Sequence, residues 1–233
     1  MTTATVIGSE ARVRIGRRLA GPLLITSRQG HSVAGALRVA EALARRDGVH
    51  AHVLGTAAEL GQAESAASAA ARERGAEYIL TGVPPRGTRA RSARFAAATR
   101  LADDARVPVL LVPAETESLP RRAVVAMDSD EASMSAAAAA LALLGVDGSL
   151  TLSSADPAEI RALQGFAVTL GVLGGLDVRA TVLPPVPSMV PGFVGGFDLV
   201  AVPTASADPV ILASAPGSVL IVPTAEADEG GGV

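Results

Sequence analysis

The sequence lacks cysteine and lysine altogether, and its 233 residues include no tryptophan and one tyrosine. Without cysteine the chain can form neither disulfides nor thiolate metal sites, and three histidines are too few to indicate structural zinc. His50 and His52 alternate onto one face of a predicted strand, but no third ligand lies near them in the sequence, so we assign no metal site. Few rings for base stacking and a net charge of −3 argue against nucleic-acid binding.

Long apolar runs are also missing. The most apolar stretch, residues 162–176, is shorter than the about 20 residues that span a bilayer, and Asp177 follows it directly. The start of the sequence lacks the cationic patch and apolar segment of a secretory signal. We therefore expect a cytoplasmic protein without a transmembrane segment.

Charge is sorted along the chain. Residues 1–122 hold 18 arginines against 11 acidic residues, whereas residues 123–233 hold 2 arginines against 12 acidic residues. Two interpretations follow from this asymmetry: the halves attract each other, or the first half meets an anionic partner.

The two halves repeat one pattern at a spacing of about 100 residues. In each half an apolar strand is followed by a polar turn, an alanine-rich helix and a second strand, and two further strands close the pattern. The predicted segments of the first half are 22–27, 33–46, 50–54, 77–82 and 107–113. Their counterparts in the second half are 123–128, 132–144, 150–153, 197–202 and 217–223.

These continuous apolar strands indicate a parallel sheet covered by helices on both faces, and the fold class is therefore α/β with two tandem Rossmann-like units. The copies are unequal. Residues 55–76 leave room for one helix, whereas the second half fits a helix at 157–173 and a strand at 178–183. Residues 184–196 are rich in proline and glycine, which indicates that a helix has been lost there.

The predicted organisation has five parts. They are an arm or edge strand at 1–20, a shortened first domain at 21–114, a linker at 115–121, a second domain at 122–224 and a disordered tail at 225–233.

The closing segments carry a family resemblance. GAEYILTG at 75–82, followed by VPVLLVP at 107–113, resembles the universal stress protein pattern of strand, phosphate loop, helix and closing strand. The opening strands PLLITSRQGHS and AVVAMDSDEAS are similar to the first strand of that family. The resemblance covers residues 21–223 and implies an adenine-nucleotide alpha-hydrolase-like fold. It also implies an intramolecular pseudo-dimer through the closing strands, with Val109, Leu111, Val219 and Ile221 at the interface.

The family's nucleotide-binding members wrap the phosphates in a loop of pattern G-x2-G-x9-G-[S/T], whose glycines let backbone N–H groups approach the phosphate oxygens. Aligned without gaps from Gly82, the second glycine falls on Pro85, the third on Phe95 and the hydroxyl on Ala96. Proline has no N–H to offer. We therefore expect this loop not to hold ATP in the family manner.

The two halves also differ at the end of the first strand. The resemblance places the family's first-strand aspartate at Ser27 in the first half and at Asp128 in the second. In the second half, however, the loop at 202–209 is too short to contain the phosphate-binding pattern. We therefore predict no cofactor, with ATP and AMP both disfavoured.

Other residues could bind an anion in place of the missing glycines. Arginine side chains lie along the predicted loop and the helix after it, where guanidinium groups could replace backbone donors, although a solvated surface explains them as well. The candidates for nucleotide or anion binding are Ser27, Gly82, Arg86, Gly87, Arg89, Arg91, Asp128 and Ser129, with Arg94 and Arg100 further along the helix. Asp128 has the spacing of a helix cap towards Glu131, which we favour over a magnesium site.

The sequence thus favours a regulatory or binding protein of universal stress type, not an enzyme, that pairs its own halves and contacts a larger protein or a second copy. One alternative is an accessory subunit of a membrane transporter or larger complex, with a peripheral membrane partner. Another is a stress protein that binds adenine nucleotides weakly. An enzyme using Asp128 under a lid at 184–196 is least favoured, since no acid–base pair or nucleophile can be assembled.

Overall fold

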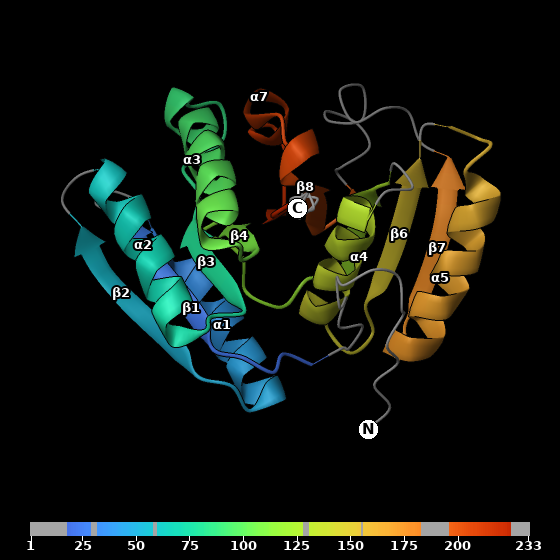
Figure 1. Cartoon of the computed structure of the whole chain (residues 1–233), viewed down its shortest axis with the longest axis horizontal. Helices are drawn as coiled ribbons and strands as arrows, with labels where there is room; N and C mark the ends of the chain where they lie inside the picture. Colours follow the sequence, from blue (N-terminus) through green and yellow to red (C-terminus); the bar gives the residue numbers. More distant parts are fainter. Residues whose placement is uncertain are drawn as a thin grey trace, which may run out of the picture.

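The computed structural model describes residues 18–28, 32–57, 60–127, 131–154, 156–182 and 196–224. Strands and helices alternate along the chain (Figure 1). The first half contains β1 (Leu23–Arg28), α1 (Ala34–Asp47), β2 (Ala51–Ala57), α2 (Leu60–Arg74), β3 (Tyr78–Gly82), α3 (Arg89–Ala105) and β4 (Val109–Val112). The second half contains β5 (Arg122–Ala126), α4 (Glu131–Leu143), β6 (Ser149–Ser154), α5 (Ile160–Gly174), β7 (Asp177–Val182), β8 (Leu199–Pro203), the short helix η2 (Thr204–Ser206), α7 (Pro209–Leu212) and β9 (Ser218–Val222).

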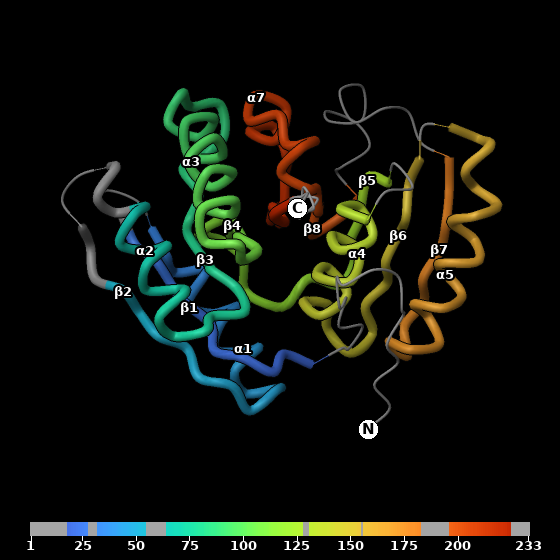
Figure 2. The backbone as a smooth tube through the Cα atoms, viewed as in Figure 1, coloured from blue at the N-terminus to red at the C-terminus, as the bar shows by residue number. Residues whose placement is uncertain are grey.

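The nine strands of the described residues form one sheet in the order β2-β1-β3-β4-β9-β8-β5-β6-β7. Seven neighbouring pairs are parallel, and only β4 and β9 run antiparallel. The predicted fold class, α/β with a mostly parallel sheet, is confirmed. Figure 2 shows the first half at one end of the molecule and β6, β7 and α5 at the other.

The antiparallel pair joins the two halves. Val109 lies opposite Ile221, and Leu111 lies opposite Val219. These four side chains, which the sequence predicts at the interface, have no exposed surface and belong to one hydrophobic cluster. A continuous sheet therefore replaces the interface between two separate domains.

Helices cover the sheet on both faces. Buried side chains of α1, α4 and α5 pack in one cluster on one face, and those of α2, α3 and α7 pack in a second cluster on the other. Most of the buried helix residues are alanine, valine and leucine, which allow the helices to lie close to the strands. Both clusters contain strand residues from each half, so neither half has a core of its own.

The halves differ in the way that the sequence indicates. Four strands belong to the first half and five to the second, because α5 and β7 have no counterpart in the first. The single helix predicted within 55–76 is α2. Asp128, Ser129, His31 and most of the predicted arm, the tail and the segment 184–196 lie outside the described residues.

Side chains of the first half hold α4 of the second half at one end of the junction. Arg46 donates from Nη1 to the Leu144 carbonyl at 2.7 Å and from Nη2 to the Ala142 carbonyl at 2.6 Å. Its guanidinium also pairs with Asp47, whose side chain is fully buried, at 2.6 Å. One arginine therefore neutralises a buried acid and caps the C-terminal end of a helix 96 residues away in the chain.

Tyr78 makes a further contact with α4: its hydroxyl donates to the Ala139 carbonyl at 2.9 Å. Burial raises the pKa of the Tyr78 phenol well above its ordinary value, Glu77 raises it further, and Arg46 opposes the rise. The phenol therefore stays protonated and remains a donor at any physiological pH.

Among the described residues, five ion pairs bear on the charge asymmetry of the chain. Four of them join residues on the same side of the division between residues 122 and 123: Arg45–Glu41, Arg46–Asp47, Arg100–Glu64 and Arg179–Asp177. The fifth, Arg122–Asp198 at 3.8 Å, crosses that division, but Arg122 begins β5 and Asp198 precedes β8, so both belong to the second structural unit. The arginine hydrogen bonds described across the junction end on backbone carbonyl oxygens. Arginine thus joins the halves by capping carbonyl groups, a use that net charge alone does not reveal.

We expect Arg46→Met to lower the free energy of unfolding by about 2 to 4 kcal/mol, because a buried carboxylate and two carbonyl groups lose their donor. Urea denaturation followed by circular dichroism measures the change. Arg45→Met is the control: this neighbouring arginine is 75% exposed and pairs with exposed Glu41, so its loss should stay below about 0.5 kcal/mol. Equal losses in both variants would contradict the role given to Arg46.

Candidate functional site

The candidate crevice lies where β1 and β3 end and α3 begins. Parallel strands of such sheets collect ligands at their carboxyl ends. Gly82 ends β3, and a side chain there would place its Cβ 2.1 Å from the Ser32 carbonyl oxygen. The backbone before α1 therefore packs directly on Gly82 and occupies the space above this strand end. Ser27 lies half-buried in β1 nearby.

Buried side chains also cover the same strand end. The Thr81 hydroxyl donates to the Thr26 carbonyl at 3.2 Å, and Arg94 of α3 donates from Nη2 to the Thr81 hydroxyl oxygen. All three residues are buried. This chain of bonds ties α3 to β3 and β1, so Arg94 serves packing at a point where the sequence alone allowed an anion ligand.

Arg91 is buried one helical turn earlier, with 2% of its surface exposed. Its guanidinium donates to the Pro84 carbonyl at 2.9 Å and to the Ala215 carbonyl at 2.8 Å, and it lies 5.7 Å from the ring centre of Phe95. Burial lowers the pKa of Arg91, nearby Arg86 lowers it further, and Glu115 raises it. Arg91 therefore joins the first-half loop to the second half and does not face an open cleft.

The remaining arginines divide in the same way. Arg86 donates to the Pro216 carbonyl at 2.7 Å, next to the residue that Arg91 holds. Arg100 pairs with Glu64 of α2 at 3.6 Å. Arg89 opens α3 and is exposed. The structure thus brings Arg86 and Arg91 together at the junction and leaves Arg89 on the surface.

The gap-free alignment of the phosphate loop is wrong about where the loop ends. Because α3 begins at Arg89, Phe95 and Ala96 lie inside the helix, and Phe95 is a core residue with 1% exposure. The segment between β3 and α3 therefore has only six residues, 83–88. Gly87 has a left-handed φ of 76° and stands directly before Thr88, the N-cap residue of α3. A glycine followed by a hydroxyl residue before a helical pattern was the signal that locates this start.

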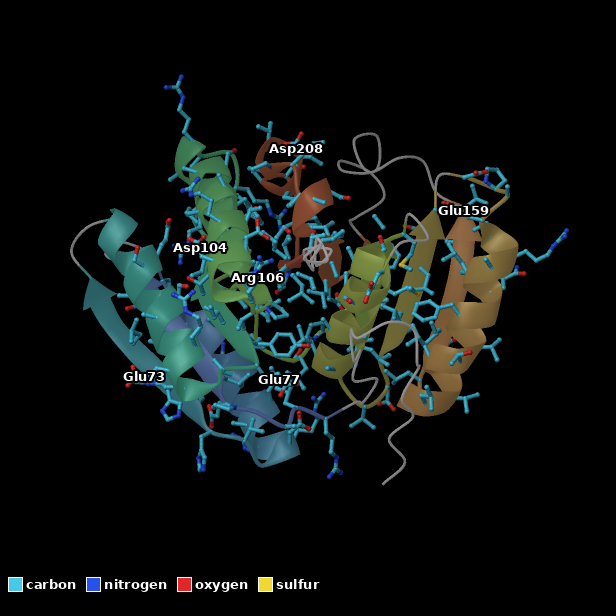
Figure 3. The ribbon with its side chains drawn as sticks, in the orientation of Figure 1. Glu73, Glu77, Asp104, Arg106, Glu159 and Asp208 are labelled. Carbon is cyan, nitrogen blue, oxygen red and sulfur yellow. The ribbon has the colours of Figure 1, made fainter. Side chains whose placement is uncertain are left out.

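In the second half, an acidic side chain occupies the corresponding helix start. Asp208, labelled in Figure 3, caps α7 by accepting hydrogen bonds from the amides of Val210 at 2.8 Å and Ile211 at 3.3 Å. The Thr224 hydroxyl oxygen accepts a further hydrogen bond, from the backbone amide of Ala205, at 3.2 Å. Sequence reasoning missed this cap, although Asp208 followed by Pro209 is a typical helix start.

A separate cleft of about 750 Å³ lies along the linker between the halves. Arg86 and Arg121 line it together with Glu115, Glu117 and Asp198, so its walls carry both signs of charge. Neither Ser27 nor Gly82 lines this cleft, which is thus not the predicted crevice.

The described ranges contain neither a candidate metal site nor a candidate membrane-spanning helix. Among these residues, no three histidine or acidic side chains gather in a group that could hold a metal ion. No helix among them is long and apolar enough to cross a membrane.

Comparison with known proteins shows the fold. A universal stress protein from Archaeoglobus fulgidus matches 87% of this chain and 86% of its own at 14% identity, with a TM-score of 0.54. A proposed universal stress protein from Pseudomonas aeruginosa covers 86% of this chain and 82% of its own at 16% identity and a TM-score of 0.47. No family model matches the sequence, and no curated protein is significantly similar to it. The chain therefore has the fold of universal stress proteins, with two repeats in one sheet.

We expect Gly82→Ala to destabilise the fold by about 1 to 3 kcal/mol, because the added methyl group meets the rigid Ser32 carbonyl. Thermal and urea unfolding measure the loss. Gly165→Ala on α5 is the matched control, since its Cβ meets nothing within 4 Å and alanine favours a helix. If Gly82→Ala were as stable as Gly165→Ala, the crevice above β3 would be open and not filled by the backbone.

Proposed function

We propose that this chain is a tandem universal stress protein of the binding or regulatory kind, acting in the cytoplasm, that neither holds ATP in the family manner nor catalyses a reaction. One observation carries the proposal: at the start of α7 and above Gly82, the chain itself occupies the positions where phosphates would bind. The Asp208 carboxylate accepts hydrogen bonds from two backbone amides of α7, and the Ser32 backbone covers Gly82.

The shortened first-half loop supports the proposal. Of its six residues, Pro84 and Pro85 have no backbone N–H. Two buried arginines next to it donate to oxygen atoms of the protein, which leaves those guanidinium donors unavailable to a triphosphate. In the second half the negative charge of Asp208 lies where phosphate would approach, so it would repel a nucleotide.

A second candidate has one specific observation in its favour. Gly87 and Thr88 directly precede α3, the Thr88 side chain makes no capping hydrogen bond to the helix, and Arg86 is an exposed residue of the same loop. A helix start of this kind favours anions. Weak binding of an adenine nucleotide through this point is therefore the alternative that an experiment has to test.

We expect MgATP and AMP to leave the stability of the purified chain unchanged, and mass spectrometry of the denatured protein to find no nucleotide. A ligand at about 100 times its Kd would add about 2.7 kcal/mol to the free energy of unfolding. Calorimetric titration, with phosphate release as the readout for hydrolysis, completes the test.

A nucleotide that copurifies stoichiometrically, or a clear stabilisation by MgATP, would overturn the proposal. Two variants then locate the site: Arg86→Gln next to the first-half loop, and Arg161→Gln on α5 as a charge-matched control in the other half. Loss of binding in Arg86→Gln alone would show that the first-half loop is a working nucleotide site.

A further inference from the structure

The cleft along the linker has walls from both repeats and from the linker itself. Pro113, directly after β4, belongs to the first wall, and linker residues 115–120 form the second. The third wall contains residues at the starts of β5, β8 and β9, namely Arg122, Asp198 and Ser218. In Figure 2 the segment from β4 to β5 crosses between the two halves. Only a chain that joins both repeats has such a linker wall.

Hydrogen bonds hold the linker wall in place. Arg38 of α1 donates from Nε to the Thr116 carbonyl at 2.8 Å and from Nη2 to the Ala114 carbonyl. At the other end of the linker, the Pro120 carbonyl accepts a hydrogen bond from the Gly145 amide at 2.9 Å. The cleft is therefore preformed, and a ligand would not have to order the linker in order to bind.

Asp198 presents a fixed carboxylate to the cleft. Its Oδ2 atom accepts hydrogen bonds from the backbone amides of Arg121 at 3.0 Å and Arg122 at 3.1 Å. Its Oδ1 atom lies 3.8 Å from Arg122 Nη2, which is too far for a hydrogen bond, and 43% of the side chain is exposed. One oxygen of an oriented carboxylate is therefore available to a donor on a ligand.

Other charges that line the cleft are unpaired within the described part of the chain. The side chains of Glu117, Asp147 and Arg121 are exposed and make no hydrogen bond or ion pair with another described residue. The half-buried side chains of Leu119 and Phe197 add apolar surface to the lining. Opposite charges therefore share one cleft without neutralising each other.

This lining selects among classes of ligand. An anion such as phosphate would be repelled by the carboxylates of Glu117, Asp147 and Asp198. A divalent metal ion would need several of them at once, and the described residues contain no group of three histidine or acidic side chains that could hold one. An uncharged ligand would displace water from the charges without pairing them. A molecule with both an ammonium group and a carboxylate matches both signs.

We propose that the cleft binds a small zwitterionic molecule of the amino-acid or short-peptide class. The ammonium group donates to Asp198 Oδ1, where Glu117 and Asp147 add negative potential, and the carboxylate pairs with the Arg121 guanidinium. The volume of about 750 Å³ lies within the range of about 300 to 1,000 Å³ that small-molecule sites have. Because this cleft is separate from the crevice at the end of β3, the proposal is independent of nucleotide binding there.

Calorimetric titration of the full chain with trialanine and with alanine tests the proposal. Saturable binding of at least one of them, with a Kd below about 1 mM, is the expected result. The tighter of the two shows whether a peptide or a free amino acid is the better ligand. N-acetylation and C-terminal amidation of the tighter probe should each weaken binding at least about tenfold, since each removes one charge.

Two variants connect each end of the ligand with its residue. Arg121→Gln should bind the free and the amidated probe equally, and Asp198→Asn should bind the free and the acetylated probe equally. Arg161→Gln and Asp104→Asn are controls of matching charge outside the cleft, and they should discriminate as wild type does. The Arg121 side chain bonds to no described residue, so Arg121→Gln keeps the test decisive even if Asp198→Asn lowers stability.

Three results would overturn the proposal. They are no saturable binding of either probe up to about 10 mM, a probe capped at both ends that binds as tightly as the free one, and an Arg121→Gln variant that still prefers the free carboxylate. Circular dichroism checks that each variant keeps the fold.

Discussion

The antiparallel pairing of β4 with β9 is the contact on which the rest of the structure depends. It joins the two repeats in one sheet. Because the pair is antiparallel, the strands of the second repeat begin on the side of the sheet where the strands of the first repeat end. The loop 83–88 therefore lies against residues 215 and 216 of the second half. The site that could receive a phosphate and the junction between the halves are built from the same residues.

This overlap explains how the chain uses its arginines. A carbonyl at a loop or helix end needs a donor, and a guanidinium supplies several in a fixed plane while its charge remains on the chain. Arg46 and Arg91 do this on opposite faces of the sheet, and Arg106 adds a bond to the Thr224 carbonyl at 3.2 Å. Arginines that bind carbonyl groups within the protein are not placed for a ligand, so fastening the halves is consistent with the proposed loss of a phosphate site.

Most of the fold could be predicted from the sequence, because its strands are continuous apolar runs and its helices end at glycines such as Gly48. The unequal halves could be predicted as well, since 55–76 is too short for a helix and a strand. The hydrogen bond from Arg91 to the Ala215 carbonyl could not be predicted, because Ala215 lies 124 residues away in the chain and the composition does not indicate such a contact. The loop alignment failed for a related reason. Aligning the pattern without gaps placed Phe95 in the loop, although Phe95 lies within α3, whose start is marked by Thr88.

Native-state hydrogen exchange at the amides of β4 and β9 measures directly whether this strand pairing holds the two halves together. If the pairing holds one cooperative unit together, amides such as those of Leu110 and Leu220 exchange only through global unfolding, with the free energy that denaturation of the whole chain gives. Exchange of the β9 amides at a clearly lower free energy than those of β1 and β3 would show that the halves separate while the first stays folded, which would contradict the account.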